Sequence, residues 1–405
     1  MPVSKDFIQV SHAGSLPRTP ELIAAYAARE NGHETTAFNQ KLSTAVADLV
    51  QRQKAIGITI PGDGEFGKSM SSTVDYGAWW SYSFQRTSGL ELDHDASWLL
   101  SNVQSVADDV KITGFLNRRD RVTFSDAYND PDSGIFTSNQ NAEPKPFPKV
   151  VGPISYIGHD AIAQDTTNLR RALDAAGVTD GFITSIAPGS AMRIGNDHYR
   201  TDEELVYAWA DVMREEYKAI IDAGLILQID DPSLAENWDQ INPEPSVSDY
   251  LRFSQTRIEA LNHALRDLPE DRIRYHLCWG SWHGPHTTDL EFTHIVDLML
   301  QVRASGFTFE AANVRHEHEY TVWDNVKLPE GKYIIPGVVS HATNVVEHPE
   351  LVAQRIERFA ERVGRENVVA STDCGLGGRI HADIAFAKLE SLARGAEIAS
   401  ARLWK

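Results

Sequence analysis

The stretch DEELVYAWADVMREEYKAIIDAGLILQIDDP, residues 202–232, joins a helical pattern directly to a short apolar run. Apolar residues recur at helical spacing as far as Gly224, and Thr201 stands where an N-cap belongs. The run at 225–232 is typical of a buried strand, and it ends in two aspartates. A helix followed at once by such a strand is the repeating unit of a parallel α/β sheet, so we predict a helix at 202–224 and a strand from 225.

The same unit recurs on both sides of this stretch. Runs rich in β-branched residues begin near residues 7, 57, 148, 181, 273, 307, 333 and 367, and an amphipathic stretch at 349–364 is the second clear helix. We predict a (β/α)8 TIM barrel forming one catalytic domain over residues 1–405, with one of the nine runs outside the barrel. An open doubly wound sheet is the alternative, but the glycine fingerprint of nucleotide-binding folds is absent.

Residues 75–147 interrupt this alternation. They start with DYGAWW at 75–80 and continue with polar stretches and turn signals such as NDPDSG at 129–134. We predict an insertion after the second strand, with a β-hairpin inside it. Such a segment is either a decoration of the barrel or a lid over the substrate.

Charge and composition narrow the possible partners and the compartment. The formal net charge is -19 and the sequence pI is about 5.2, which disfavours nucleic acid and anionic membranes as partners. No stretch approaches the roughly 18 apolar residues that span a bilayer, and the first ten residues lack the apolar run of a signal peptide. We therefore expect a cytoplasmic protein whose two cysteines stay reduced.

Polar residues crowd the end of almost every predicted strand. Polar side chains are costly inside a packed barrel but suit its mouth, where barrel active sites are built. The residues at these ends are Gly14, Ser15, Asp63, Glu65, Asp230, Asp231, His276, Cys278, Glu310, His341, Asp373 and Cys374.

Four of these residues form a candidate zinc site. His276 and Cys278 are two apart on one predicted strand, so their side chains point to the same face, while Glu310 and Cys374 end two other strands. Imidazole, thiolate and carboxylate are all zinc ligands, and a site with two thiolates suits the binding and activation of a substrate thiol. The alternative interpretation is two buried thiols that act as small apolar groups.

Seven short motifs, in this order, resemble those of the cobalamin-independent methionine synthase family. The likeness is to its catalytic C-terminal barrel and to single-barrel relatives that include epoxyalkane:coenzyme M transferases. The motifs are HAGSLPRTPEL (12–22), GDGE (62–65), LQIDDPSL (227–234), HLCWG (276–280), FEAANVRHEHE (309–319), PGVVSH (336–341) and STDCGLGGR (371–379).

The resemblance implies a role for each matching residue. It implies that zinc is the cofactor and that its ligands are His276, Cys278, Cys374 and Glu310. It implies that the amino acid end of homocysteine is bound by Gly14, Ser15, Glu65 and Asp230. It also implies that His341 handles the proton left on the methyl donor, and we take His341 and Asp230 as the catalytic side chains.

The resulting expectation is a zinc-dependent methyltransferase that activates a thiol as its thiolate. Homocysteine is the expected acceptor and methionine the product. The methyl or alkyl donor is a folate, a corrinoid carrier protein or an epoxide. The alternatives are alkyl transfer to another thiol such as coenzyme M, a non-catalytic zinc barrel, and a decarboxylase-like barrel that needs no thiolate.

Overall fold

The computed structural model describes residues 4–30, 35–68, 78–135, 146–280 and 282–405. Its strands are β1 Gln9–Val10, β2 Thr87–Asp93, β3 Phe147–Tyr156, β4 Phe182–Ile186, β5 Gly195–Asn196, β6 Ile226–Asp230, β7 Ile273–Leu277, β8 Gly306–Phe309, β9 Tyr333–Val339 and β10 Val369–Thr372. Its α-helices are α1 Pro20–Glu30, α2 Thr35–Ala55, α3 Ala78–Gln85, α4 Arg119–Thr123, α5 Ser125–Asn129, α6 His159–Ala176, α7 Pro188–Ala191, α8 Asp202–Asp222, α9 Ser233–Glu236, α10 Val247–Ala264, α11 Val296–Met299, α12 Pro349–Val363 and α13 Ala382–Leu403. Short 3₁₀ helices are η1 Phe115–Asn117, η2 Glu270–Arg272, η3 Phe292–His294, η4 Glu317–Asp324 and η5 Arg365–Asn367.

Seven strands form one curled sheet in which every pairing is parallel. The strand order is β1-β10-β9-β8-β7-β6-β4, so from β6 to β10 each strand lies beside the next one in the chain. All five residues of β6 and all five of β7 are buried, as expected for strands covered on both faces. The predicted α/β fold with a parallel sheet is confirmed.

The segment at residues 58–62 lies between the two ends of this sheet. The backbone N–H groups of Thr59 and Ile60 each donate to the carbonyl oxygen of Val10 in β1, both at 3.0 Å. On its other side, Gly62 bridges Phe182 in β4 in parallel fashion, and the Phe182 N–H donates to the Pro61 carbonyl oxygen at 3.1 Å. The run predicted near residue 57 thus contacts both β1 and β4, although it is too irregular to form a ladder of its own.

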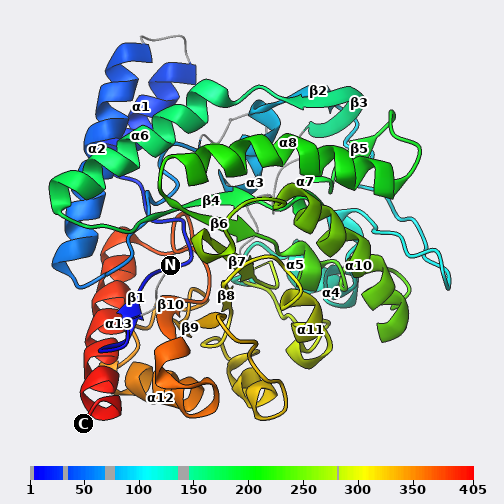
Figure 1. The fold of residues 1–405 in the computed structure, drawn as a ribbon. Coiled ribbons are helices and arrows are strands. Elements are labelled where there is room, and N and C mark those ends of the chain that lie inside the picture. Colours follow the sequence, from blue (N-terminus) through cyan, green and yellow to red (C-terminus); the bar gives the residue numbers. More distant parts are fainter. Residues whose placement is uncertain (1–3, 31–34, 69–77, 136–145, 281) are drawn as a thin grey trace.

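Helices cover the outside of the sheet, and Figure 1 shows them around it. In α8 the Thr201 hydroxyl oxygen accepts a hydrogen bond from the Glu204 N–H at 3.1 Å, and the chain leaves the helix through Gly224 at φ +72°. Helix α12 begins at Pro349 and ends just before Gly364. The two helices predicted most clearly from the sequence therefore have the predicted ends, within two residues.

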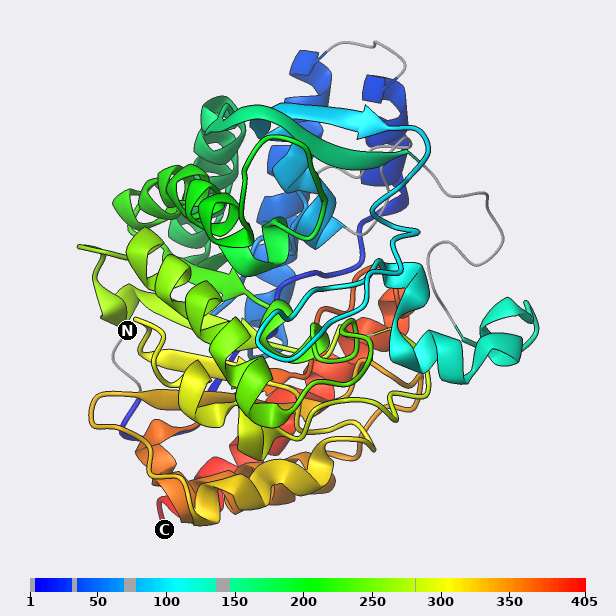
Figure 2. The same cartoon turned by 90° about the vertical axis from the view of Figure 1, so that its right-hand side faces the viewer.

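A second sheet of three strands lies apart from the curled sheet, in the order β2-β3-β5. The predicted run near residue 148 is strand β3, which lies in this second sheet; with the irregular segment at 58–62, two of the nine predicted runs are not strands of the curled sheet. The antiparallel partner that β3 pairs with, β2, belongs to the segment predicted as an insertion. Figure 2 shows the chain after β2, in cyan, on the side facing the viewer. Residues 75–77 and 136–145 of that segment lie outside the described residues.

The two ends of the described chain meet at β1. Strand β1 pairs with β10, and the Ile8 N–H donates to the Ser400 hydroxyl oxygen on α13 at 2.9 Å. The Trp404 indole N–H donates to the Lys5 carbonyl oxygen. Within the described ranges, none of the helices has an apolar stretch long enough to cross a bilayer.

Candidate metal and thiol site

Parallel strands deliver the predicted site residues to one edge of the curled sheet. Asp230 is the last residue of β6, and it pairs in register with His276 on β7. Cys278 follows β7 by one residue and Glu310 follows β8 by one. Because the carboxyl ends of parallel strands lie at the same edge, residues far apart in the sequence become neighbours here.

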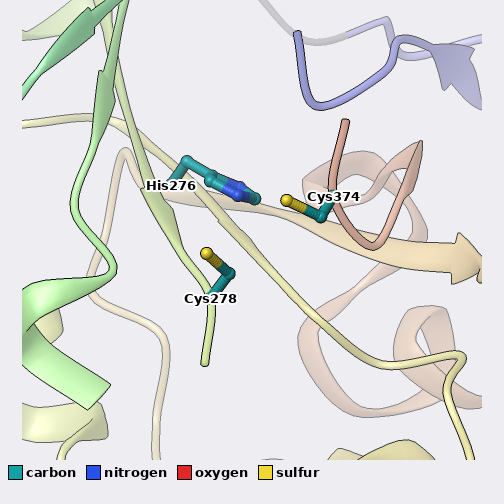
Figure 3. Close-up of side chains that lie close together, drawn as sticks. All are labelled: His276, Cys278 and Cys374. Carbon is teal, nitrogen blue, oxygen red and sulfur yellow. The ribbon is translucent and has the colours of Figure 1, made fainter. Parts of the chain in front are cut away.

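Three of the four predicted metal ligands converge. The side chains of His276, Cys278 and Cys374 point toward one another, and their ligand atoms all lie within 4.8 Å of one another (Figure 3). His276 and Cys278 are 3% and 6% exposed. Nδ1 of His276 lies 3.3 Å from the Thr308 hydroxyl, whereas its Nε2 is buried without a hydrogen-bond partner among the described residues. An imidazole nitrogen left bare beside two sulfurs matches the ligand chemistry of zinc.

The two thiols differ in acidity. A hydrogen bond from Cys278 holds the pKa of Cys374 well below that of an ordinary thiol, and His276 lowers it further. The same hydrogen bond, together with burial, raises the pKa of Cys278 well above the ordinary value. Burial disfavours the charged imidazole, but Cys374, Asp230 and Glu310 together outweigh burial and raise the pKa of His276. Within the pair, the shared hydrogen bond therefore favours loss of the proton from Cys374 over Cys278, and the thiolate is the form that binds metals.

Glu310, the fourth predicted ligand, lies in a neighbouring group with His341 and Asp373. The ligand atoms of these three residues are also within 4.8 Å of one another. Oε1 of Glu310 accepts from the Trp279 N–H at 3.1 Å, and Oε2 accepts from the Asn313 amide at 2.6 Å. Glu310 is close enough to Cys374 for the thiolate to raise its carboxyl pKa, in addition to the effect of burial.

His341 is buried and uncharged in this group. It is 2% exposed, and its Nδ1 has no hydrogen-bond partner among the described residues. Burial lowers its pKa to about 3, although Cys374 opposes this shift. The uncharged imidazole is the form that can accept a proton, but its burial makes it a weak base in this position.

The predicted substrate residues Glu65 and Gly14 adjoin each other. Glu65 is 2% exposed and has a left-handed backbone at φ +61°. Its Oε1 accepts from the Thr184 hydroxyl at 2.7 Å, while its Oε2 is buried and unpaired among the described residues. A Cβ on Gly14 would lie 3.4 Å from Oε1 of Glu65 and 2.8 Å from the Thr184 methyl carbon. Only glycine fits there, because φ at Gly14 is also +129°.

Asp230 and Ser15 complete the predicted set. Oδ1 of Asp230 accepts from the Gln228 amide at 2.7 Å, and burial raises the Asp230 pKa to about 7 although His276 lowers it. The Ser15 carbonyl oxygen accepts from the N–H groups of Leu376 and Gly377 at 2.8 and 3.1 Å. Ser15 therefore lies against the loop that follows Cys374.

Two further residues of this region were not predicted from the sequence. Lys68 places its ammonium 3.3 Å from Oε1 of Glu65, and Gln228 bonds to both Asp230 and the Ala13 carbonyl oxygen. Gln228 stands two residues before Asp230 on the same strand, so period-two spacing was the available signal. Lys68 follows Glu65 by three residues in a turn, where the sequence carries no comparable signal.

The chain matches the family model described as "Cobalamin-independent synthase, Catalytic domain" over residues 97–397. It is 26% identical over 204 residues to a methionine synthase of Thermococcus kodakarensis, covering 50% of this chain and 52% of that protein. It is 27% identical over 237 residues to the 2-hydroxypropyl-CoM lyase of Xanthobacter autotrophicus, covering 51% of this chain and 58% of that protein. The chain thus spans about half the length of each of these two relatives.

Two solved structures share the fold over nearly the whole chain. A B12-independent methionine synthase from Shewanella sp. W3-18-1, solved with selenomethionine, has a TM-score of 0.69 at 19% identity and covers 98% of this chain and 99% of that one. A putative vitamin-B12 independent methionine synthase from Listeria monocytogenes has a TM-score of 0.63 at 20% identity, covering 96% and 98%. With the family model matching most of the sequence, the chain belongs to the family of cobalamin-independent synthase catalytic domains.

Proposed function

We propose that this chain is a zinc-dependent methyltransferase that methylates the sulfur of homocysteine to give methionine. The observation that carries the proposal is the convergence of His276, Cys278 and Cys374 beside the buried carboxylates of Asp230 and Glu65. One group suits a soft metal ion and the other suits an ammonium. A thiol that carries an amino group meets both needs.

His276, Cys278 and Cys374 would hold the zinc, and Glu310 would be the fourth ligand. The fit rests on the unpaired Nε2 of His276 and on the two cysteine sulfurs, which lie within 4.8 Å of the imidazole ligand atom and of each other. Bound there, zinc lowers the pKa of an incoming thiol and holds it as the thiolate, which is the better nucleophile. Glu310 would be the hardest of the four donors and would hold the zinc least tightly against a competing sulfur ligand.

The chain's own residues would bind and orient the two reactants. Oε2 of Glu65 and Oε1 of Gln228 are buried acceptors without partners among the described residues, and with Asp230 they suit the substrate ammonium. Ser15 would meet the carboxylate end. His341, neutral and buried, would take up or deliver the proton on the leaving group if the donor is a folate.

We also propose that the fold is a closed (β/α)8 barrel over residues 1–405, in which the segment 58–62 is the second strand. The contacts of 58–62 with both β1 and β4 support this closure. We propose 75–147 as an insertion after that strand and as a lid that excludes water. Its buried Arg118 supports the lid, because the guanidinium donates to Asp239 at 2.6 Å and to Glu236 at 3.0 Å on the chain that follows β6.

A second candidate is alkyl transfer to a thiol other than homocysteine, such as coenzyme M, with an epoxide as donor. The likeness to the Xanthobacter 2-hydroxypropyl-CoM lyase favours it. The carboxylates of Glu65 and Asp230 disfavour coenzyme M as the acceptor, because a thiol with a sulfonate group has no ammonium for these carboxylates to bind.

The test is a thiol–donor screen on zinc-loaded protein. Homocysteine and coenzyme M are each paired with a methyl-folate, a methylated corrinoid carrier protein and an epoxide, and products are identified by mass spectrometry. We expect methionine from homocysteine, and zinc X-ray absorption should gain a sulfur scatterer at about 2.3 Å when homocysteine is added. If neither thiol changes the zinc shell, thiol activation is wrong and a non-catalytic zinc site becomes the better account.

A further inference from the structure

Lys68 places a buried positive charge among the residues assigned above to the substrate. Its side chain is 3% exposed, and its ammonium lies 3.3 Å from Oε1 of Glu65. The same ammonium donates to the Thr184 hydroxyl and lies 4.3 Å from the centroid of the Tyr82 ring. A lysine is rarely buried this fully without a reason in its surroundings.

The backbone around this lysine is held in place. The guanidinium of Arg18 donates to the carbonyl oxygens of Glu65 at 2.8 Å and Lys68 at 2.6 Å. The loop also passes close to a neighbour at Gly67, where a Cβ would lie 1.8 Å from Oδ1 of Asp165. The Glu65–Lys68 ion pair is therefore organised before any ligand arrives.

Lys68 leaves the neighbouring acceptors unsatisfied. Oε2 of Glu65 and Oε1 of Gln228 remain buried and unpaired among the described residues. Both side chains lie near Gly14, since a Cβ there would lie 3.4 Å from Oε1 of Glu65 and 3.8 Å from Nε2 of Gln228. An added ammonium would therefore find acceptors even with Lys68 in place, which argues that the lysine does not occupy the ammonium position.

We propose that Lys68 binds the α-carboxylate of the acceptor thiol, while Glu65, Gln228 and Asp230 bind its α-ammonium. The Glu65–Lys68 pair would then be the charge complement of a zwitterion, and Lys68 would be a specificity-determining residue. The site would select a thiol that carries both charges over one that carries either charge alone. This inference rests on the proposed function and defines its acceptor more narrowly.

The experiment compares three thiols by calorimetric titration of zinc-loaded protein. They are homocysteine, its decarboxylated analogue aminopropanethiol and its deaminated analogue mercaptobutanoate. We expect Lys68→Gln to lower the affinity for homocysteine and for mercaptobutanoate by about 10- to 100-fold, because a charge-assisted hydrogen bond is lost. The affinity for aminopropanethiol should change by less than about threefold, since this thiol has no carboxylate for Lys68 to bind.

Two variants serve as controls. Lys68→Arg keeps the cation and should retain most of the affinity for homocysteine. Lys332→Gln removes a partly buried lysine that precedes β9, at the opposite edge of the sheet from the site. The Lys332 ammonium donates to the Ala304 carbonyl oxygen at 2.8 Å. This variant should leave all three affinities unchanged. Zinc content shows that each variant is folded.

Several results would overturn the inference. It fails if Lys68→Gln binds homocysteine more tightly than the wild-type protein does, because the lysine would then occupy the ammonium position. It also fails if the affinity for all three thiols falls equally. If Lys68→Gln does not fold, the wild-type protein decides: equal affinity for homocysteine and aminopropanethiol refutes a carboxylate contact. If the wild-type protein binds none of the three thiols, the proposed function itself is wrong, and this inference falls with it.

Discussion

The two cysteines have unequal roles because they share a hydrogen bond. That bond lowers the pKa of Cys374 and raises the pKa of Cys278, so Cys374 is the more acidic thiol of the pair. Because cysteine binds metals as the thiolate, metal binding at this cluster is expected to release a thiol proton.

We predict that purified protein holds about one zinc per chain, and that Cys278→Ser and Cys374→Ser each remove most of it. A serine hydroxyl is a poor zinc ligand at neutral pH, so neither variant keeps the three-donor cluster. Metal analysis by mass spectrometry measures this. Asp230→Asn is the matched control. It alters a carboxylate that neighbours His276 in register without removing a cluster ligand, and it should keep its zinc while binding homocysteine more weakly. Full zinc content in both serine variants would rule out the site.

At the scale of elements, the insertion is tied to the loops at the strand ends by buried charges. Arg118 donates to Asp239 and Glu236, and its guanidinium lies 3.7 Å from the centroid of the Trp282 ring. Trp282 in turn donates to the Tyr128 hydroxyl at 2.5 Å. The residues that follow β2 are therefore anchored to the chain after β6 and to the chain after β7.

We predict that Arg118→Met loosens this anchoring, because it leaves two buried carboxylates without one of their cations, at a cost of about 3 kcal/mol. Amides of residues 115–129 should then exchange with deuterium faster than in the wild-type protein. Arg121→Met, in the same segment, is the control, since Arg121 forms no ion pair among the described residues. Unchanged exchange in Arg118→Met would show that the segment is held by other contacts.

A second tie joins the loop after β7 to η4 through a charged histidine. Nδ1 of His316 bonds to Glu319 at 2.8 Å and Nε2 bonds to Asp289 at 3.0 Å. Burial opposes the charge, but the two carboxylates raise the His316 pKa to about 10, from an unfolded value near 6.5. A raised histidine pKa means that its contribution to stability is complete below about pH 6.5 and is lost as the pH rises toward 10.

We therefore predict that the wild-type free energy of unfolding falls between pH 6.5 and pH 10 more steeply than that of His316→Gln. The difference should be on the order of a few kcal/mol. Urea unfolding at several pH values measures it. His198→Gln, which alters an exposed histidine, should follow the wild-type curve. Parallel curves for wild type and His316→Gln would show that His316 is not charged in the folded protein.

The sequence was informative where elements are regular and less so where they are not. The ends of α8 and α12 follow from Thr201, Gly224 and Gly364, because caps act locally. The run at 148–153 resembled a barrel strand, and no local signal separated it from the others. Its place beside β2 depends on pairing partners distant in the chain.

The site was predictable in its ligand types but not in its grouping. Strand-end positions indicated His276, Cys278, Cys374 and Glu310, yet the placement of Glu310 next to His341 depends on how the strands are staggered. The charge of Lys68 beside Glu65 depends on a left-handed turn and on a contact with Thr184 in another strand. Tertiary contacts of this kind leave no periodic pattern in a sequence.

At the scale of the whole molecule, the candidate ligands connect strands β7 and β10, which are separated in the sheet by β8 and β9. A metal ion bound there stabilises only the folded chain. We predict that chelator treatment lowers the thermal unfolding temperature, with zinc contributing about 2.7 kcal/mol at a free concentration one hundred times its dissociation constant. Thermal scans over a zinc series measure this. Cys374→Ser should show no dependence on zinc. If the unfolding temperature of the wild-type protein does not depend on the zinc concentration, the prediction is contradicted.

The meeting of the two chain ends at β1 has a consequence for synthesis in the cell. Strand β1 leaves the ribosome well before its partner β10 and the Ser400 hydroxyl, because 392 residues separate Ile8 from Ser400. At translation speeds of roughly 5–20 residues per second, the interval is on the order of tens of seconds. During that time the apolar side chains of Ile8 and Val10 lack their final cover. Cys374 is the last of the three cluster residues to be made, so the metal cluster cannot be complete before β10 has emerged.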